Sequence, residues 1–253
     1  MELITVIMPF FKKKEYFKDT YKSVINQTYQ NLEVIIIYDD YDKKDLDFIN
    51  DIVKDDKRVK VFSNHSNLGA GMSRNEGIKI SKGLYIAFVD CDDIWNENKI
   101  EYQYNFMKKN NSKFSHTSYE IINSSNISIG LNIAKKNLEY NDLINSCDIG
   151  LSTVMIKKEL FNISNFKNIN TKEDYALWLE LSRNNIKIDG INKTLAKWRK
   201  TENSLSNSYY YKFVNAFKVY YLYEKKNILI SVFLVINLGL NYLKKKIKQK
   251  KNL

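Results

Sequence analysis

The sequence of 253 residues is poor in cysteine, histidine, proline and glycine, with two, two, one and eight of them respectively. Because Cys91 and Cys147 are the only cysteines, a disulfide framework and a four-cysteine zinc site are excluded, and a reducing compartment is indicated. Two histidines cannot build a three-histidine metal centre. The first residues have no basic segment and too short an apolar run for a signal peptide, and the reduced thiols lead us to expect a cytoplasmic protein.

The composition is that of a globular protein with a strongly basic end. Hydrophobic residues make up 44% of the chain and charged residues 27%, which excludes disorder as the main state. The net charge is +11, and residues 206–253 hold ten lysines against one glutamate. We therefore expect a nearly neutral domain over residues 1–205 and a helical, basic extension over 206–253. With four arginines in the chain, no nucleic-acid partner is predicted.

Short apolar segments alternate with amphipathic ones in the first part of the chain. We expect strands at residues 3–8, 32–38, 59–63 and 84–89, and helices at 15–26, 43–54 and 69–81. The segment LEVIIIY at 32–38 is continuously apolar, as in a strand buried on both faces. This alternation predicts an α/β fold with a parallel sheet and helices on both faces.

The pattern is less regular after residue 95. We expect helices at residues 96–109, 172–183 and 209–223, strands at 114–122, 151–156, 186–191 and 194–198, and a loop or hairpin at 123–137. Residues 228–243 form an apolar run that leads into the lysine-rich end. The run is too short and too polar to read as a confident membrane span, so an interfacial helix is favoured, with a packing helix as the alternative.

The polar residues that could carry chemistry follow the ends of the first strands. Asp39 and Asp40 follow the second strand, the loop at 64–69 follows the third and leads to Arg74, and Asp-Cys-Asp-Asp at 90–93 follows the fourth. In open α/β sheets, ligands bind beyond the carboxyl ends of the strands. We therefore expect these groups to lie along one edge of the sheet and to form one site.

The run at 90–93 is the sharpest of these features. Its three carboxylates repel one another unless a divalent cation neutralises them, and such oxygen ligands suit Mg²⁺ or Mn²⁺. Cys91 is expected to be a small wall residue rather than a ligand. The structural alternative places Asp93 at the cap of a helical turn and Asp90 in a solvated loop.

Several further motifs stand in order along the chain. They are VIMP at 6–9, SVINQTY at 23–29, EVIIIYDD at 33–40, NLG at 67–69, RNEGI at 74–78, GLYIAFVDCDDIW at 83–95 and TKEDYALW at 171–178. The series resembles family 2 glycosyltransferases of the GT-A fold, densely over residues 3–110 and thinly over 150–205. The resemblance implies a Rossmann-type, mostly parallel sheet flanked by helices, with a helical C-terminal extension.

The resemblance also implies an activity. It is an inverting transfer of a sugar from a nucleotide-sugar donor, expected to be a UDP-sugar, to a hydroxyl of a glycan or lipid-linked acceptor in bacterial surface polysaccharide synthesis. Asp39 would bind the nucleobase, Asp90 would touch the ribose and support the metal, and Asp92 of the DXD motif would ligate Mn²⁺ or Mg²⁺. Asp174 would act as general base. The other donor-binding candidates are Pro9, Phe11, Asp40, Asn67, Arg74 and Cys91.

The sequence departs from the family pattern in three places. Residues 9–12 read PFFK rather than Pro-x-Tyr-Asn, which removes a hydroxyl and an amide. Residues 38–41 read YDDY rather than Asp-Asp-Gly-Ser, so either Asp39 or Asp40 could contact the nucleobase. Residues 197–206 lack the histidine that this stretch often carries.

Other interpretations stay open at this point. Thr171 and Asp174 have the spacing of a capping box, a structural role that can stand beside the catalytic one because a capped helix start is a rigid mount for a base. A nucleotidyltransferase would also use acidic metal ligands, although residues 9–14 lack its glycine-rich loop. A non-catalytic sugar-nucleotide-binding protein is a second alternative. The basic tail and its aromatic neighbours predict an anionic membrane surface as partner, and hence a peripheral position on the inner face of the plasma membrane.

Overall fold

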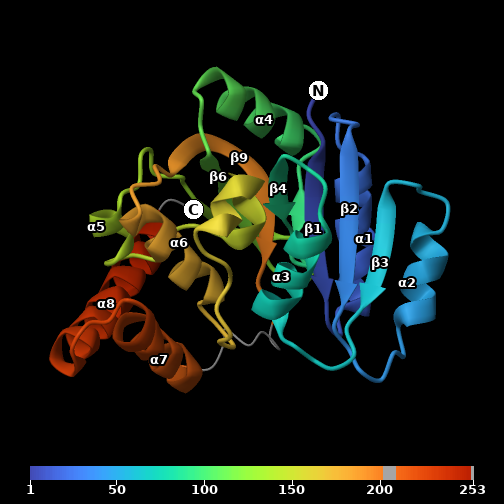
Figure 1. Cartoon of the computed structure of the whole chain (residues 1–253). Coiled ribbons are helices and arrows are strands. Elements are labelled where there is room, and N and C mark those ends of the chain that lie inside the picture. Colours follow the sequence, from blue (N-terminus) through green and yellow to red (C-terminus); the bar gives the residue numbers. More distant parts are fainter. Residues whose placement is uncertain (202–208, 252–253) are drawn as a thin grey trace.

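The computed structural model describes residues 1–201 and 209–251. Its first part follows the expected alternation (Figure 1). The elements are β1 (Ile4–Phe10), α1 (Lys14–Ile25), β2 (Leu32–Tyr38), α2 (Leu46–Val53), β3 (Val59–Ser63), α3 (Ala70–Ile80) and β4 (Tyr85–Phe88). These four strands are parallel, in the order β3-β2-β1-β4. The predicted α/β class is confirmed.

Side-chain alternation along the strands places apolar residues on both faces of the sheet. In β1, Val6 faces a core cluster that includes Phe17 of α1, whereas Ile7 faces a second cluster that includes Ile78 of α3. β2 is buried along its whole length, as its unbroken apolar run predicts. The strand order reverses between β1 and β4, which is the switch point where open α/β sheets bind ligands.

The sheet continues from β4 through strands of mixed direction. They are, in spatial order, β8 (Met155–Lys157), β6 (Phe114–Ile122), β9 (Asp189–Arg199) and β5 (Ile94–Trp95), while β7 (Ser128–Asn132) forms the hairpin partner of β6. The remaining helices of this half are α4 (Lys99–Lys109), the short α5 (Tyr140–Leu143) and α6 (Glu173–Arg183). Two expected strands at 186–191 and 194–198 are one strand, β9, because register shifts against β6 absorb the polar residues between them.

The expected strand at 151–156 is divided. Leu151–Thr153 form a 3₁₀ turn and only Met155–Lys157 pair in the sheet, after which Lys158–Asn162 form a second 3₁₀ turn. The first turn arises because both the backbone N–H and the hydroxyl of Thr153 donate to the carbonyl of Gly150, a local bond that competes with the sheet ladder.

The C-terminal part consists of α7 (Tyr209–Lys218), a π-helical turn (Val219–Tyr223) and α8 (Ile228–Lys251), which lie beside α6 (Figure 1). Ala216, Leu234 and Leu238 are buried in the same cluster as Trp178 of α6. The extension therefore packs on the sheet domain. The predicted domain boundary at 205/206 lies outside the described residues. Among those described, the helix over Ile228–Lys245 is long and apolar enough to cross a membrane by length and composition alone.

Candidate active site

Polar groups after β2, β3 and β4 meet at one edge of the sheet. Because β1 pairs in parallel with both β2 and β4, Asp39 and Asp90 follow strands that end on the same side. Hydrogen bonds to two neighbouring residues of helix α3 link these two aspartates. Asn64 donates from Nδ2 to Asp39 Oδ1 at 2.7 Å and to Ser73 Oγ of α3 at 3.0 Å, and the next residue, Arg74, donates to Asp90 Oδ1 at 2.7 Å.

Asp39 is buried and holds the loop between β3 and α3. Its Oδ1 also accepts the backbone N–H of Leu68, and its Oδ2 accepts that of Gly69, both at 2.8 Å. Gly69 has φ of 81°, a left-handed conformation that glycine adopts without strain. Asp40 is equally buried, but its Oδ1 has no hydrogen-bond partner within the described residues. Burial raises the pKa of Asp40, with the Asp42 carboxylate adding to the effect.

Arg74 joins two acidic motifs that are far apart in the sequence. Its side chain is buried and donates to Asp90 Oδ1 and to Glu173 Oε1, both at 2.7 Å. Burial alone would lower the pKa of Arg74, but the Asp90 and Glu173 carboxylates raise it, so the guanidinium stays charged. The close approach of α3 to Glu173 needs a glycine, because a Cβ at Gly71 would lie 2.9 Å from Glu173 Cγ.

In the 90–93 run each carboxylate has a different partner. Asp92 forms an ion pair with Lys13 at 2.8 Å. Asp93 is buried and accepts hydrogen bonds from the hydroxyl of Ser152 at 2.5 Å and the backbone N–H of Arg199 at 2.8 Å. Asp93 therefore ties this run to β9 and the 3₁₀ turn, and the structural alternative that placed it at a helix cap is wrong. Cys91 is a buried thiol that contacts the carbonyl of Pro9, as expected of a wall residue.

Burial and mutual repulsion act on these acids together. Burial raises the pKa of Asp92 and the Asp90 carboxylate raises it further, while Lys13 lowers it. Burial, followed by repulsion from Asp92 and Asp90, raises the pKa of Asp93 well above its ordinary value. A positive charge placed near Asp92 therefore offsets this repulsion and favours the ionised carboxylate.

The donor set at Asp90 and Asp92 fits a divalent cation only in part. The two side chains remain 36% and 17% exposed, so each can present carboxylate oxygen toward the edge of the sheet. No group of three or more His, Cys, Asp or Glu side chains suited to hold a metal is found within the described residues. The residues fit an Mg²⁺ or Mn²⁺ ion that takes its other ligands from water and substrate phosphates, rather than a closed protein cage.

Asp174 is the second residue of α6, two positions after a residue with a strained backbone. Lys172, the residue before the helix, has φ of 72°, and no side-chain cap bond is present there. Thr171 instead accepts a hydrogen bond from Asn215 of α7 at 2.9 Å, so the alternative of a capping box between Thr171 and Asp174 is wrong. Asp174 Oδ1 accepts the backbone N–H of Tyr175 at 2.7 Å. Burial raises the pKa of Asp174, whereas Lys172 and Arg74 lower it.

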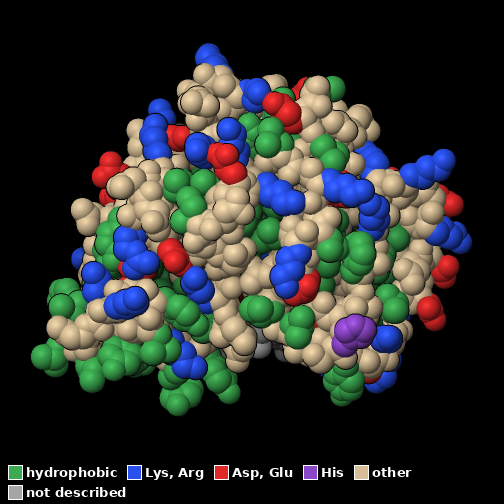
Figure 2. Space-filling view, in the orientation of Figure 1, with side chains coloured by type: hydrophobic (Ala, Val, Ile, Leu, Met, Phe, Trp, Pro, Cys, Tyr) green, Lys and Arg blue, Asp and Glu red, His purple; other side chains and the backbone are tan. Residues whose placement is uncertain are grey.

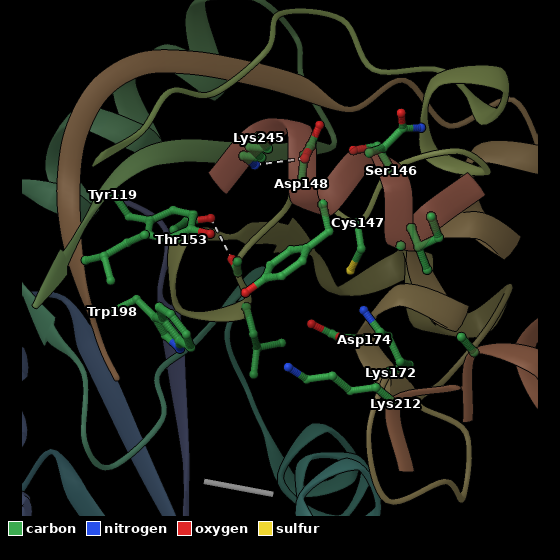
Figure 3. Close-up of a pocket in the computed structure, with 18 of the residues that line it drawn as sticks. Tyr119, Ser146, Cys147, Asp148, Thr153, Lys172, Asp174, Trp198, Lys212 and Lys245 are labelled. Atoms are coloured by element: carbon green, nitrogen blue, oxygen red, sulfur yellow. Dashed lines mark hydrogen bonds and ion pairs between the residues drawn. The ribbon is translucent and has the colours of Figure 1, made fainter. Parts of the chain in front are cut away.

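A cavity of about 720 Å³ connects the two acidic motifs (Figure 3). Asp90 and Asp174 both line it. One part of its wall comes from β6, β9 and the segment 146–153, including Tyr119 and Trp198, and the other comes from α7 and α8. In Figure 3, Lys212 of α7 extends into the cavity on the same side as Lys172 and Asp174, while Tyr119 and Trp198 lie across from them.

The other predicted site residues lie around this centre. Pro9 is within β1 and contacts Cys91, whereas Phe11 is 41% exposed and Asn67 is exposed in the loop before α3. Sequence reasoning did not single out Lys13, Ser152 or Arg199 as contacts of the 90–93 run. For Lys13 the sequence offered one signal, its place in a basic run directly after the first strand. The contacts of Ser152 and Arg199 depend on tertiary structure.

Comparison with known proteins gives a consistent result. The family model described as glycosyl transferase family 2 matches residues 5–164. The chain is 36% identical over 207 residues to the Escherichia coli protein named UDP-Glc:alpha-D-GlcNAc-diphosphoundecaprenol beta-1,3-glucosyltransferase WfgD, covering 81% of this chain and 80% of that protein. It is 33% identical to the putative teichuronic acid biosynthesis glycosyltransferase TuaG of Bacillus subtilis, covering 88% of each.

Solved structures show the same fold at low identity. TarS residues 1–349 of S. aureus in complex with UDP-GlcNAc superposes with a TM-score of 0.69 at 17% identity, over 93% of this chain and 70% of that one. The mannosyltransferase PcManGT of Pyrobaculum calidifontis in complex with GDP-Man and Mn²⁺ gives a TM-score of 0.65 at 11% identity, over 91% of this chain and 69% of that one. The GT-A-like fold inferred from the sequence is confirmed.

Proposed function

Because the chain belongs to glycosyl transferase family 2, and is thus an inverting glycosyltransferase that uses a nucleotide-sugar donor, we propose that it takes the sugar from a UDP-sugar and transfers it to a hydroxyl of a lipid-linked acceptor. The relatives WfgD and TuaG support an acceptor of this class in surface glycan synthesis. The observation that carries the proposal is Arg74, which contacts Asp90 and Glu173 at 2.7 Å each. It couples the proposed donor edge to the helix that bears the proposed base.

On the donor side we assign Asp39 to the nucleobase and Asp90 to the ribose. Asp39 is held rigidly, and its Oδ2 accepts one backbone N–H, which leaves that oxygen room for a second donor such as a uracil N–H. Asp40 is the competing assignment. If Asp39 is the contact, Asp39→Asn weakens UDP binding much more than Asp40→Asn does, and isothermal titration with UDP distinguishes them.

Asp92 and Asp90 would hold Mg²⁺ or Mn²⁺, which when bound neutralises charge on the departing diphosphate. Lys13, 2.8 Å from Asp92, is close enough to add a second positive charge at the same place. Asp174 accepts the proton of the acceptor hydroxyl as it attacks the anomeric carbon from the face opposite the diphosphate. A single displacement of this kind inverts the anomeric centre and needs no enzyme nucleophile.

The activity is tested with the full chain and a panel of UDP-, GDP- and dTDP-sugars, by measuring released nucleotide with Mn²⁺, with Mg²⁺ and with EDTA. We expect one donor to be used and EDTA to stop turnover. Asp92→Asn should lower turnover by roughly 10²-fold or more while the fold is kept. Binding of a nucleotide sugar without any turnover would instead favour a non-catalytic binding protein.

We also propose that the protein lies on the inner face of the plasma membrane. Apolar side chains gather over α7 and α8 (Figure 2). Among them Leu229, Tyr210 and Phe233 are 82%, 72% and 66% exposed. These residues, with Leu222, Ile236 and Leu240, are called the outer apolar face. The lysine-rich end of α8 supplies the charge that anionic lipids attract.

A further inference from the structure

Lys13 places a positive charge on the carboxylate that the proposed function assigns to the metal. Its Nζ lies 2.8 Å from Oδ2 of Asp92, and it also donates to the hydroxyl of Thr201 at 3.2 Å. Among the described residues, no other lysine or arginine forms an ion pair with the Asp92 carboxylate, because Arg199 donates to the backbone carbonyl of Asp92 instead. Lys13 is therefore the counterion of the proposed metal ligand.

The backbone of Lys13 is fixed, whereas its ammonium group has more than one partner. The carbonyl of Lys13 accepts the backbone N–H groups of Tyr16 and Phe17, both at 3.1 Å, in the first turn of α1. The side chain is 25% exposed, and its Nζ lies 5.8 Å from the ring centre of Tyr16. An ammonium has three donors on a flexible stem, so it can leave Asp92 and still keep Thr201 and the aromatic ring.

A divalent cation and this ammonium compete for the same carboxylate. The Asp92 side chain is only 17% exposed, which limits how many cations can reach its oxygens together. An Mg²⁺ or Mn²⁺ ion bound to Asp92 would stand beside the ammonium, where like charges repel, or would displace it. Displacement leaves the ammonium close to the remaining ligands of the ion, which the proposed function assigns to the diphosphate of the donor.

We propose that Lys13 is an exchangeable counterion, which holds Asp92 until a divalent cation takes the carboxylate and then pairs with the diphosphate of the donor. Lys13 thus opposes binding of the metal alone and favours binding of the metal together with a nucleoside diphosphate. The exchange rests on the proposed function for the identity of the donor. The competition between the two cations rests on the ion pair between Lys13 and Asp92.

The test measures binding of Mn²⁺ alone to the full chain by electron paramagnetic resonance, at pH 8, where protons compete least for the carboxylate. The wild type is compared with Lys13→Met, Lys13→Arg and Lys12→Met. Lys12 is the matched control, because its ammonium lies over the ring of Phe11, at 5.0 Å from the ring centre, and its removal changes the net charge equally. We expect Lys13→Met to bind Mn²⁺ about fivefold more tightly than Lys12→Met, near the upper end of measured effects of partly exposed ion pairs. Lys13→Arg keeps the ion pair and should resemble the wild type.

Titration with UDP, with Mn²⁺ and with EDTA, tests the exchange. Since the coupling between two ligands is the same from either side, the factor by which UDP tightens Mn²⁺ binding measures it. We expect this factor to be smaller in Lys13→Met than in the wild type, because only the wild type is relieved of the competition when the diphosphate accepts Lys13. With EDTA, Lys13→Met should bind UDP more weakly, because a charge-assisted pair with phosphate is lost.

The outcomes separate this proposal from the proposed function. Mn²⁺ binding by Lys13→Met that is no tighter than that of Lys12→Met would overturn the proposal, and damage to the fold would also weaken binding rather than tighten it. An unchanged coupling factor would overturn the exchange. Absence of UDP binding by the wild type would instead contradict the proposed function, and the Mn²⁺ comparison would then decide the competition by itself. If Lys13→Met unfolds at a lower temperature than the wild type, Lys13→Gln replaces it.

Discussion

Asp174 is held between two opposing effects that set how well it can serve as a base. Burial raises its pKa, and Lys172 and Arg74 lower it without cancelling that rise. An aspartate with a raised pKa takes a proton from a sugar hydroxyl more readily than a fully solvated one. The acid limb of kcat should accordingly lie above the ordinary aspartate pKa of 3.8.

The variant Asp174→Asn keeps the shape of the side chain and removes its basicity. We expect sugar transfer to fall by about 10²- to 10⁴-fold, the usual contribution of a general base, while UDP affinity stays near that of the wild type. Steady-state transfer and titration with UDP measure the two effects. Parallel loss of transfer and UDP binding, or loss of neither, would show that Asp174 is structural.

A second residue-scale prediction concerns His116 in β6. Burial lowers the pKa of His116 to about 4 from 6.5, and its Nε2–H donates to the carbonyl of Lys135. Between pH 6.5 and 4 the unfolded chain takes up a proton that the folded chain does not, so the folded state loses about 3 kcal/mol as pH falls through this range. We therefore expect the free energy of unfolding to fall less between pH 7 and pH 4.5 in His116→Gln than in the wild type, as measured by urea unfolding curves. Identical pH dependence in both proteins would rule out His116 as its source.

At the scale of elements, α8 is fixed at two places along its length. Its middle is anchored by apolar burial, through Leu234, Val235 and Leu238. Its C-terminal part is anchored by charge, because Asp148 accepts Lys245 and Lys135 at 2.8 Å each. Burial raises the pKa of Asp148, but the two lysines lower it to about 2. The charged anchor therefore persists at neutral pH and is lost as pH falls from about 4 to about 2.

We expect Asp148→Asn to loosen the C-terminal part of α8 by about 1 kcal/mol, since the lysines are partly exposed and screened. Hydrogen exchange of the amides from residue 241 onward should quicken, and exchange in β1 and β2 should not change. The control is Glu159→Gln, which removes a pair with Lys113 whose side chains are both about half exposed. Equal exchange rates for α8 in all three proteins would mean that apolar burial alone holds the helix.

Elements with strong periodicity were predictable, and those that depend on distant contacts were not. The strands at 32–38, 59–63 and 114–122 have the predicted bounds, because their apolar runs are flanked by turn-forming residues. Helix α2 starts at Leu46 rather than at 43, since Lys43 has φ of 51°, which no local pattern reveals. Strand β5 has only two residues, too few to show the alternation of apolar and polar side chains by which a strand is recognised.

The same limit applied to the candidate site. The acids at the strand ends were found because parallel strands place their carboxyl ends together. Arg74 and Glu173, in contrast, are 99 positions apart in the chain, and the cavity wall formed by α8 could not be inferred from any local pattern. The sequence indicated the candidate donor residues and Asp174, and the structure added the cavity that Asp90 and Asp174 both line.

For the whole molecule, exposed apolar surface gathers over α7 and α8 (Figure 2), and the sequence has six lysines between positions 244 and 251. Helix α8 carries both the outer apolar face and part of the cavity wall, and the opposite part of that wall comes from β6 and β9 of the sheet. In the proposed membrane-bound state, the catalytic edge would stay in water while a lipid-linked substrate remains in the membrane. Removal of residues after Asn227 would also uncover the core contacts of Leu234 and Leu238, so substitutions test membrane binding more cleanly than truncation.

The final prediction separates the two contributions to membrane binding by flotation with vesicles. Each lysine near an anionic leaflet contributes about 1 kcal/mol, and this attraction is screened by salt. Glutamine at positions 244, 246, 248, 250 and 251, with Lys245 kept for its ion pair with Asp148, should abolish the salt-sensitive part of flotation on phosphatidylglycerol vesicles. Leu229→Asn combined with Phe233→Asn should abolish the salt-insensitive part, which phosphatidylcholine vesicles report alone. Negligible flotation of the wild type on both kinds of vesicle would remove the case for acceptor delivery from the membrane, yet leave the transfer chemistry at Asp174 intact.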